Sequence, residues 1–186
     1  MIDIPVSGDK HFWESDHVDL LSFRRPGKSI PSRRTLVSRG RSARQLNDAA
    51  KVLGRGGASQ WARGMMADPS FVVTDGVRYE LAILFSRHLR PGYLNERIVR
   101  AAAKRRGYRT PPVEVAALWA AQAPLGERPQ FVVIMHKAIG FPGGMGLLGT
   151  EQDLGREWLK VWFADSLPRN AAFVFLAPRR KRRKRG

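Results

Sequence analysis

The residues best suited to chemistry in this sequence stand at Asp75-Gly76, where an apolar segment meets a charged one. Residues 71–73 are β-branched or aromatic and predict a short strand, whereas apolar side chains recur at helical spacing over residues 81–88. A glycine at this junction lets the backbone approach a ligand closely, and the free N–H groups at the start of a helix bind anions. The pattern indicates a phosphate site. An ordinary strand-turn-helix corner, with Asp75 as the helix cap, is the alternative.

Charged side chains around the junction extend this interpretation to phosphoryl transfer. Such a reaction needs cations on the phosphate and an acid that binds a divalent ion such as Mg²⁺ or orients water. The predicted catalytic residues are Asp75, Arg78 and Glu80. The predicted phosphate-binding residues are Gly76, Arg78, Arg41 and Arg44. For Glu80, stabilisation of the helix dipole is a competing explanation.

The order of strand, Asp-Gly-x-Arg and helix resembles the nucleotide-binding segment of the ParB/sulfiredoxin superfamily. The positions that match this pattern are Asp75, Gly76, Arg78 and Ala82. Flanking segments resemble the opening strand, the Pro-x-Arg turn and the first helix of that family at residues 18–23, 30–34 and 44–54. The chain has no cysteine, so the thiol chemistry of the sulfiredoxins is excluded.

The resemblance implies a single α/β domain over residues 1–178, with a mixed sheet and flanking helices. It also implies ATP or another nucleotide as a ligand, together with a divalent cation. The compact domain and the cationic tail are similar to the plasmid fertility-inhibition group, which includes oncogenic-suppression (Osa-like) proteins. That likeness implies a DNase with nucleotide-hydrolysing activity that blocks conjugative DNA transfer, with a type IV secretion coupling protein as its partner. The alternative is a non-enzymatic DNA- or RNA-binding architectural protein.

The charge of the chain indicates polyanionic partners whatever the fold. The sequence holds 33 Lys and Arg against 16 Asp and Glu, which gives a net charge of +17 and a pI near 11.4. Such a field attracts nucleic acid first and an anionic membrane surface second. The sequence has no cysteine, no signal peptide and no apolar segment long enough for a bilayer. These features predict a cytoplasmic protein, with a peripheral position at the inner membrane as a further expectation.

Three basic segments carry the predicted DNA contacts. Residues 23–44 hold eight cations and no acid among Pro, Gly and Ser, which predicts an irregular loop that binds phosphates or is simply solvated. A helix predicted over residues 93–107 ends in a cationic cluster, which the helix dipole also explains. The tail, residues 179–186, is expected to be disordered because its charges repel one another. The predicted DNA-binding residues are Arg33, Arg34, Lys104, Arg105, Arg106, Arg179, Arg180, Lys181, Arg182 and Arg183.

The other predicted elements have mainly structural roles. The predicted helices cover residues 60–66, 113–123 and 150–164, the predicted strands cover residues 131–136 and 171–176, and a glycine-rich loop is predicted over residues 140–146. This loop is either an anion-binding nest or a plain surface loop. His136, at a strand end, is either a ligand-facing or a structural residue. His11 and His17 are not expected to bind a metal.

Overall fold

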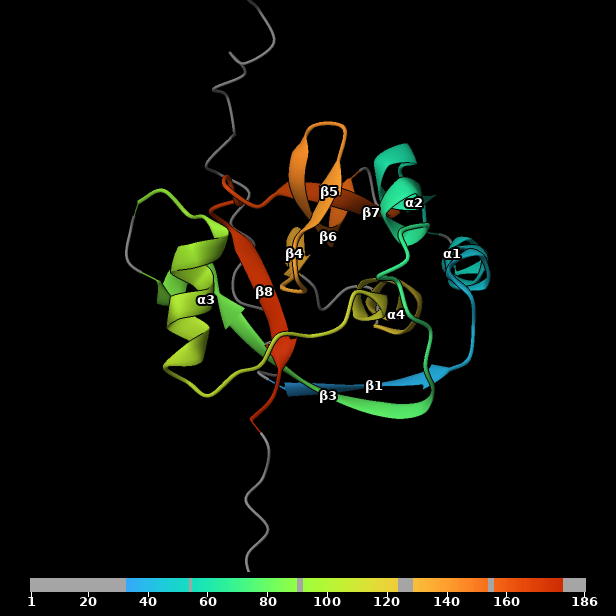
Figure 1. Ribbon diagram of the computed structural model, residues 1–186, viewed down its shortest axis with the longest axis horizontal. Helices are drawn as coiled ribbons and strands as arrows, with labels where there is room; N and C mark the ends of the chain where they lie inside the picture. Colours follow the sequence, from blue (N-terminus) through green and yellow to red (C-terminus); the bar gives the residue numbers. More distant parts are fainter. Residues whose placement is uncertain (1–32, 54, 90–91, 124–128, 154–155, 179–186) are drawn as a thin grey trace, which may run out of the picture.

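The computed structural model shows a sheet with helices on both of its faces (Figure 1). It describes residues 33–53, 55–89, 92–123, 129–153 and 156–178. The strand predicted at residues 18–23, the two N-terminal histidines and the basic tail therefore lie outside the described residues. Within them, the predicted α/β class with a mixed sheet and flanking helices is confirmed.

Strand pairing and helix capping define the elements. The strands are β1 (Arg33–Arg39), β2 (Gly57–Ala58), β3 (Asp75–Phe85), β4 (Phe131–Ile134), β5 (Ile139–Phe141), β6 (Gly144–Asp153), β7 (Arg156–Phe163) and β8 (Ala171–Leu176). The helices are α1 (Ala43–Val52), α2 (Gln60–Met66), α3 (Glu96–Lys104) and α4 (Glu114–Gln122), with a 3₁₀ turn, η1 (Ser86–His88). Side-chain oxygens of Ser42, Ser59 and Asn95 accept backbone hydrogen bonds and so fix the starts of α1, α2 and α3.

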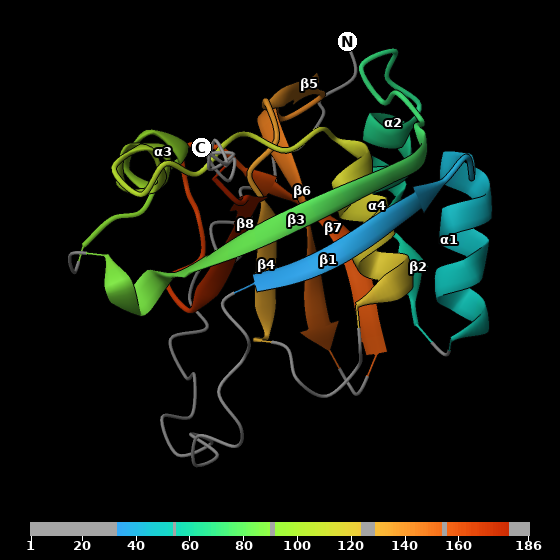
Figure 2. The ribbon, with the colours of Figure 1, turned by 90° about the horizontal axis from the view of Figure 1, so that it is seen from below.

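The sheet curls around α4. Its strands follow the order β1-β3-β8-β4-β6-β7-β2, and β5 pairs with β6. Helix α4 contacts β1 at one end of this order and β6 and β7 toward the other end (Figure 2). Residues 114–121 are all buried, and a helix that is apolar around its whole circumference is typical of a core position. The alanines of α4 let α1 and the strands approach closely around the one large side chain, Trp119.

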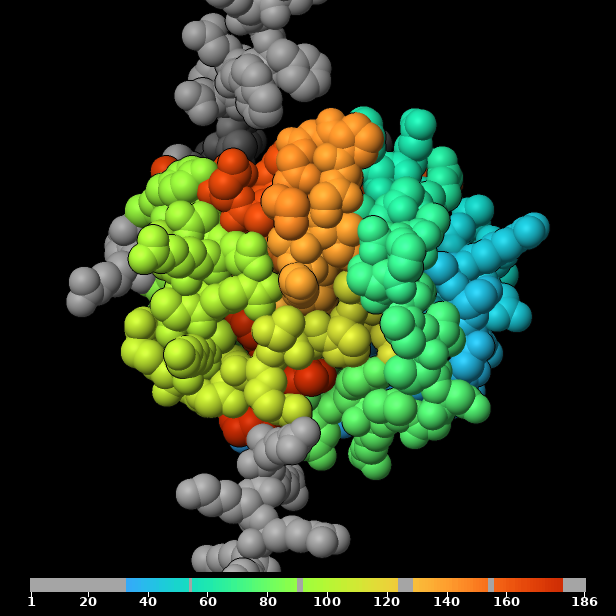
Figure 3. Space-filling model, in the orientation of Figure 1, coloured from blue at the N-terminus to red at the C-terminus, as the bar shows by residue number. Residues whose placement is uncertain are grey.

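The opposite face of the sheet is covered by α3. Val99, Ala102 and Ala103 of this helix pack in a second apolar cluster with Leu84, Met135 and Phe173. The β5–β6 hairpin rises beside α2 at the other side of the molecule (Figure 3). Edge-to-face contact between Trp61 and Phe141 joins these two elements, with ring centroids 5.9 Å apart.

The strand-turn-helix prediction for residues 71–88 is wrong. Residues 71–73 lie outside any strand, and residues 75–85 form β3, which is antiparallel to both β1 and β8. In β3, Leu81 and Ile83 face α4 whereas Leu84 faces α3. A strand buried on both faces has apolar residues at successive positions, and some of these positions coincide with helical spacing.

Three further predictions are also wrong. Residues 150–164 belong to β6 and β7, whose register runs from Gly146↔Phe163 to Asp153↔Arg156, so Thr150 is a buried strand residue and not a helix cap. The glycine-rich segment forms the β5–β6 hairpin, and part of the basic segment over residues 23–44 forms β1. The helices expected over residues 44–54, 60–66, 93–107 and 113–123 and the strands expected over residues 131–136 and 171–176 are confirmed, with ends that differ by a few residues.

Gly149 is required where β4 and β6 approach each other. A Cβ at this position would lie 2.1 Å from the carbonyl oxygen of Val132 and 2.8 Å from the ring of Trp162. We expect Gly149→Ala to lower the free energy of unfolding by about 1–3 kcal/mol or more, because backbone must move to accept the methyl group. The matched control is Gly140→Ala, since nothing lies within 4 Å of a Cβ there. Urea unfolding of both variants is the measurement, and equal stabilities would contradict this account.

Candidate nucleic-acid interface

A β-bulge occupies the position of the predicted turn at Asp75-Gly76. Val37 pairs with Arg78, but Arg39 pairs with Asp75, so β3 holds one more residue than β1 between these pairs. Gly76 has φ +65°, the left-handed conformation that a glycine in a bulge supplies. A glycine was expected here either for a positive φ or for the close approach of a ligand, and the structure shows the positive φ. The helix N-terminus that was expected to bind phosphate here is replaced by a strand.

A buried carboxylate from α4 fixes the segment that precedes the bulge. Glu114, only 1 % exposed, accepts hydrogen bonds from Thr74 N (3.0 Å) and from the hydroxyl of Tyr79. Thr74 Oγ1 lies 2.7 Å from both Glu114 Oε1 and Ser38 Oγ, and Ser38 Oγ accepts a hydrogen bond from Val77 N (3.2 Å). Burial, together with the bond to Glu114, raises the pKa of Tyr79 to about 12, so this hydroxyl stays protonated and donates. The network joins β1, β3 and α4.

Four exposed arginines lie on or beside the two strands that this network holds. Strand pairing and alternation place Arg33 and Arg78 on the face opposite Leu36 and Tyr79, which are buried toward α4. Residues 75–79 pair with β1 alone, because β8 pairs only with the second half of β3. This part of the sheet is a two-stranded ribbon. We call Arg33, Arg39, Arg41 and Arg78 the ribbon arginines.

The ribbon arginines are not paired with carboxylates of the described residues. Within the described residues none of them forms an ion pair, whereas other cations do. The ion pairs between described residues are Lys51–Asp48, Arg55–Glu157, Arg100–Glu96 and Lys160–Glu151. Exposed guanidinium groups without a protein carboxylate are suited to an external phosphate.

Arg34 differs from its neighbour Arg33. Its guanidinium lies 5.6 Å from the ring centroid of Trp119, and its side chain is half-buried. This cation–π contact faces the core, where it stabilises the packing of β1 on α4. The geometry therefore favours a structural role for Arg34, which the sequence predicted to bind DNA.

The cationic end of α3 lies on the same face of the sheet as Arg33 and Arg78. Lys104, Arg105 and Arg106 are exposed there, and Arg106 Nη1 also donates to Ala102 O (2.9 Å) within the helix. The described chain ends nearby at Pro178, directly after Ala177, whose N–H donates to Glu80 O (2.7 Å). The predicted contacts from Arg179 to Arg183 lie outside the described residues.

The predicted catalytic acids are separated. Asp75 pairs with Arg39 and Glu80 with Thr35. Five residues along a strand put their Cα atoms roughly 15 Å apart. Among the described residues, no group of three or more His, Asp or Glu is placed to hold a metal ion. Arg44 is exposed in the first turn of α1, outside the two strands of the ribbon.

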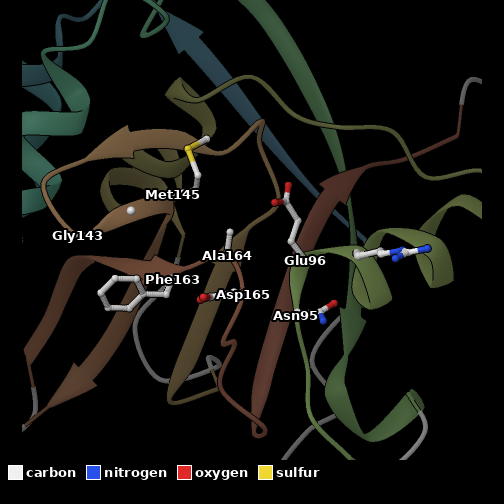
Figure 4. Close-up of a pocket in the computed structure, with 9 residues that line it drawn as sticks. Asn95, Glu96, Gly143, Met145, Phe163, Ala164 and Asp165 are labelled. Atoms are coloured by element: carbon white, nitrogen blue, oxygen red, sulfur yellow. The ribbon is translucent and has the colours of Figure 1, made fainter.

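Two hollows in the surface differ in their charge. The larger, about 420 Å³, lies between the start of α3 and strands β6 and β7, and its lining includes the carboxylates of Glu96 and Asp165 and one cation, Arg97 (Figure 4). Glu96 also accepts a hydrogen bond from Arg100 Nε (2.6 Å). The smaller, about 250 Å³, is lined by Arg39 and Arg41 and carries no acid. Of these two, the smaller hollow suits an anion.

His136 has a structural role. The ring is wholly buried, Nε2 accepts a hydrogen bond from Leu148 N (2.8 Å), and Nδ1 lies 2.7 Å from Lys137 O, to which it donates. Burial lowers the pKa of His136 to about 4, so the ring is neutral near pH 7. Its two nitrogens connect β6 to the segment that follows β4.

Comparisons with protein-family models, with curated proteins and with solved structures find no match for this chain. No helix in the part of the chain that the structure describes is long and apolar enough to cross a bilayer. The site is therefore interpreted from its own geometry.

Acid should destabilise the fold through His136. Its pKa of about 4 in the folded protein lies below the ordinary value of 6.5, so between these values the unfolded chain binds more protons and stability falls as the pH falls. The difference between these two pKa values corresponds to a loss of roughly 3 kcal/mol in the free energy of unfolding by pH 4. Urea unfolding at pH 7 and pH 5 should show a smaller acid-induced loss in His136→Gln than in the wild type. Equal losses would assign the acid sensitivity to other groups.

Proposed function

We propose that this protein binds nucleic acid through the phosphate backbone, with the ribbon arginines at the centre of the interface. The observation that carries this proposal is the set of exposed arginines on one two-stranded ribbon, none of them in an ion pair within the described residues. A guanidinium group donates two parallel hydrogen bonds to a phosphate. A two-stranded β-ribbon also has a size that the major groove of B-DNA admits.

The charge around the ribbon supports the same proposal. The net charge of +17 attracts a polyanion at long range. The end of α3 adds Lys104 and Arg105 on the face that holds Arg33 and Arg78. Pro178 lies beside Gly107, just after α3, and seven consecutive cations, Arg179 to Arg185, follow it in the sequence. Contacts of this kind bind phosphates and carry no sequence information by themselves.

The dependence of binding on salt tests the ribbon. Each phosphate contact that is lost should reduce the slope of log K against log salt by about 0.9 on duplex DNA and about 0.7 on a single strand. We expect Arg33→Ala and Arg78→Ala each to reduce the slope by about this amount, with unfolding free energies within about 0.5 kcal/mol of the wild type. Fluorescence anisotropy with labelled duplex DNA, single-stranded DNA and RNA is the measurement.

The matched control is Arg169→Ala. Arg169 is an exposed arginine just before β8, at the opposite end of that strand from Pro178. This substitution removes the same charge as Arg78→Ala and should leave the slope of log K against log salt unchanged. A reduction equal to that of Arg78→Ala would mean that binding follows net charge alone and has no defined interface.

Hydrolysis of DNA or nucleotide is a separate hypothesis, which the resemblance to the ParB/sulfiredoxin superfamily implies. The separation of Asp75 from Glu80 favours binding without hydrolysis. We therefore expect supercoiled plasmid to remain intact and ATP to remain unhydrolysed when the purified protein is incubated with both and Mg²⁺. Cleavage that is lost in Asp75→Asn or Glu80→Gln would establish the enzyme instead.

A further inference from the structure

The hollow beside Arg39 and Arg41 is lined by both cationic and apolar residues. This lining suits a small ligand with one anionic end and one less polar end. The hollow lies at the outer edge of the sheet, where the end of β1 meets α1 and α4 (Figure 2). Its apolar lining comes from Leu46, Leu118 and Ala121, which are 2 %, 2 % and 8 % exposed and so form the floor of the hollow. Its volume of about 250 Å³ is smaller than the cavities of about 300–1,000 Å³ that hold drug-sized molecules. A single nucleotide, partly open to solvent, is the size of ligand that it suits.

The polar residues that line the hollow have two roles: Gln122 stabilises the fold, whereas Arg39 and Arg41 provide positive charge. The side-chain amide of Gln122 donates to Val37 O (2.7 Å) and accepts from Val37 N (3.2 Å), so it ties the edge of β1 to α4. The two guanidinium groups have no ion pair within the described residues. Arg39 and Arg41 are therefore the groups left to bind a ligand.

Two unneutralised cations match a phosphate monoester better than a diester. A monoester carries a charge of about −1.5 to −2 at pH 7, with a second pKa near 6, whereas each diester of a nucleic-acid backbone carries −1. A nucleic-acid strand has a monoester only where one of its ends is phosphorylated.

We propose that this hollow binds the phosphorylated end of a nucleic-acid strand, with the phosphate on Arg39 and Arg41 and the terminal nucleoside against Leu46, Leu118 and Ala121. The proposal rests on the nucleic-acid binding proposed above, because the rest of the strand would continue along the ribbon toward Arg78 and Arg33. A free nucleoside monophosphate presents the same chemistry, and the experiment separates the two sources.

The test compares one labelled oligonucleotide in three forms, with a 5′-phosphate, with a 3′-phosphate and with hydroxyl groups at both ends. We expect at least one phosphorylated form to bind about tenfold more tightly than the hydroxyl form, as a charge-assisted contact provides. This preference should shrink between pH 7.5 and pH 5.5 as the monoester loses its second charge. Arg41→Ala should abolish the preference, whereas Arg33→Ala should weaken all three forms equally and leave the preference intact.

A second variant removes the apolar space without changing charge. Ala121→Leu should also abolish the preference for a phosphorylated end, while salt-dependent binding of all three oligonucleotides is retained, which shows that this buried position accepts the larger side chain without unfolding. Equal binding of the three oligonucleotides, with a salt-dependent affinity for all of them, would overturn this inference and leave the proposed nucleic-acid binding in place. If the wild-type protein binds none of the three oligonucleotides, both the strand-end proposal and the proposed nucleic-acid binding are overturned. Arg41-dependent binding of AMP, without any preference among the oligonucleotides, would assign the hollow to a free nucleotide and overturn the strand-end proposal.

Discussion

The ribbon depends on one buried acid in the central helix. Glu114 begins α4, and its carboxylate receives hydrogen bonds from Thr74 and Tyr79 at the bulged end of β3. A buried carboxylate is costly unless hydrogen-bond donors surround it, and these donors occupy both of its oxygens. Ser38 of β1 joins the same network through Thr74. One helix therefore fixes the pairing of two strands that are far apart in sequence, and with it the positions of the arginines on their exposed face.

Much of the fold follows from patterns within short segments. The helix over residues 113–123 is apolar on every side, and the strands over residues 131–136 and 171–176 are short apolar runs, so their types could be predicted. The pattern failed for β3 and for the β6–β7 pair. In β3, apolar residues occupy successive positions because both faces are covered, by α4 on one side and by α3 on the other. Whether a strand is buried on both faces depends on elements far away in the sequence, so the spacing of apolar residues within the strand cannot predict it.

The candidate site was predictable in composition but not in arrangement. The density of arginine over residues 23–44 predicted phosphate contacts, and Gly76 was predicted to need either a positive φ, which it has, or the close approach of a ligand. Arg39 was not predicted as a site residue, because its pairing with Asp75 depends on a β-bulge that the sequence pattern did not predict. Glu114 gave one usable signal, since an acid inside an apolar helix needs buried donors. Thr74 and Ser38 gave none, because their contact joins residues 36 positions apart.

The position of β1 explains part of its charge but not all of it. β1 ends the described sheet, and an edge strand exposes N–H and C=O groups that can pair with another chain. Gln122 satisfies both groups of Val37, and like charges on Arg33 and Arg39 repel a second copy of the strand. Edge protection needs only an outward-facing charge or a proline, and lysine provides such a charge as well as arginine does. It gives no reason for Arg41, which lies beyond the strand, or for an apolar hollow beside Arg39. The phosphate ligand proposed above would account for these remaining features, and its binding would also relieve the repulsion among the arginines.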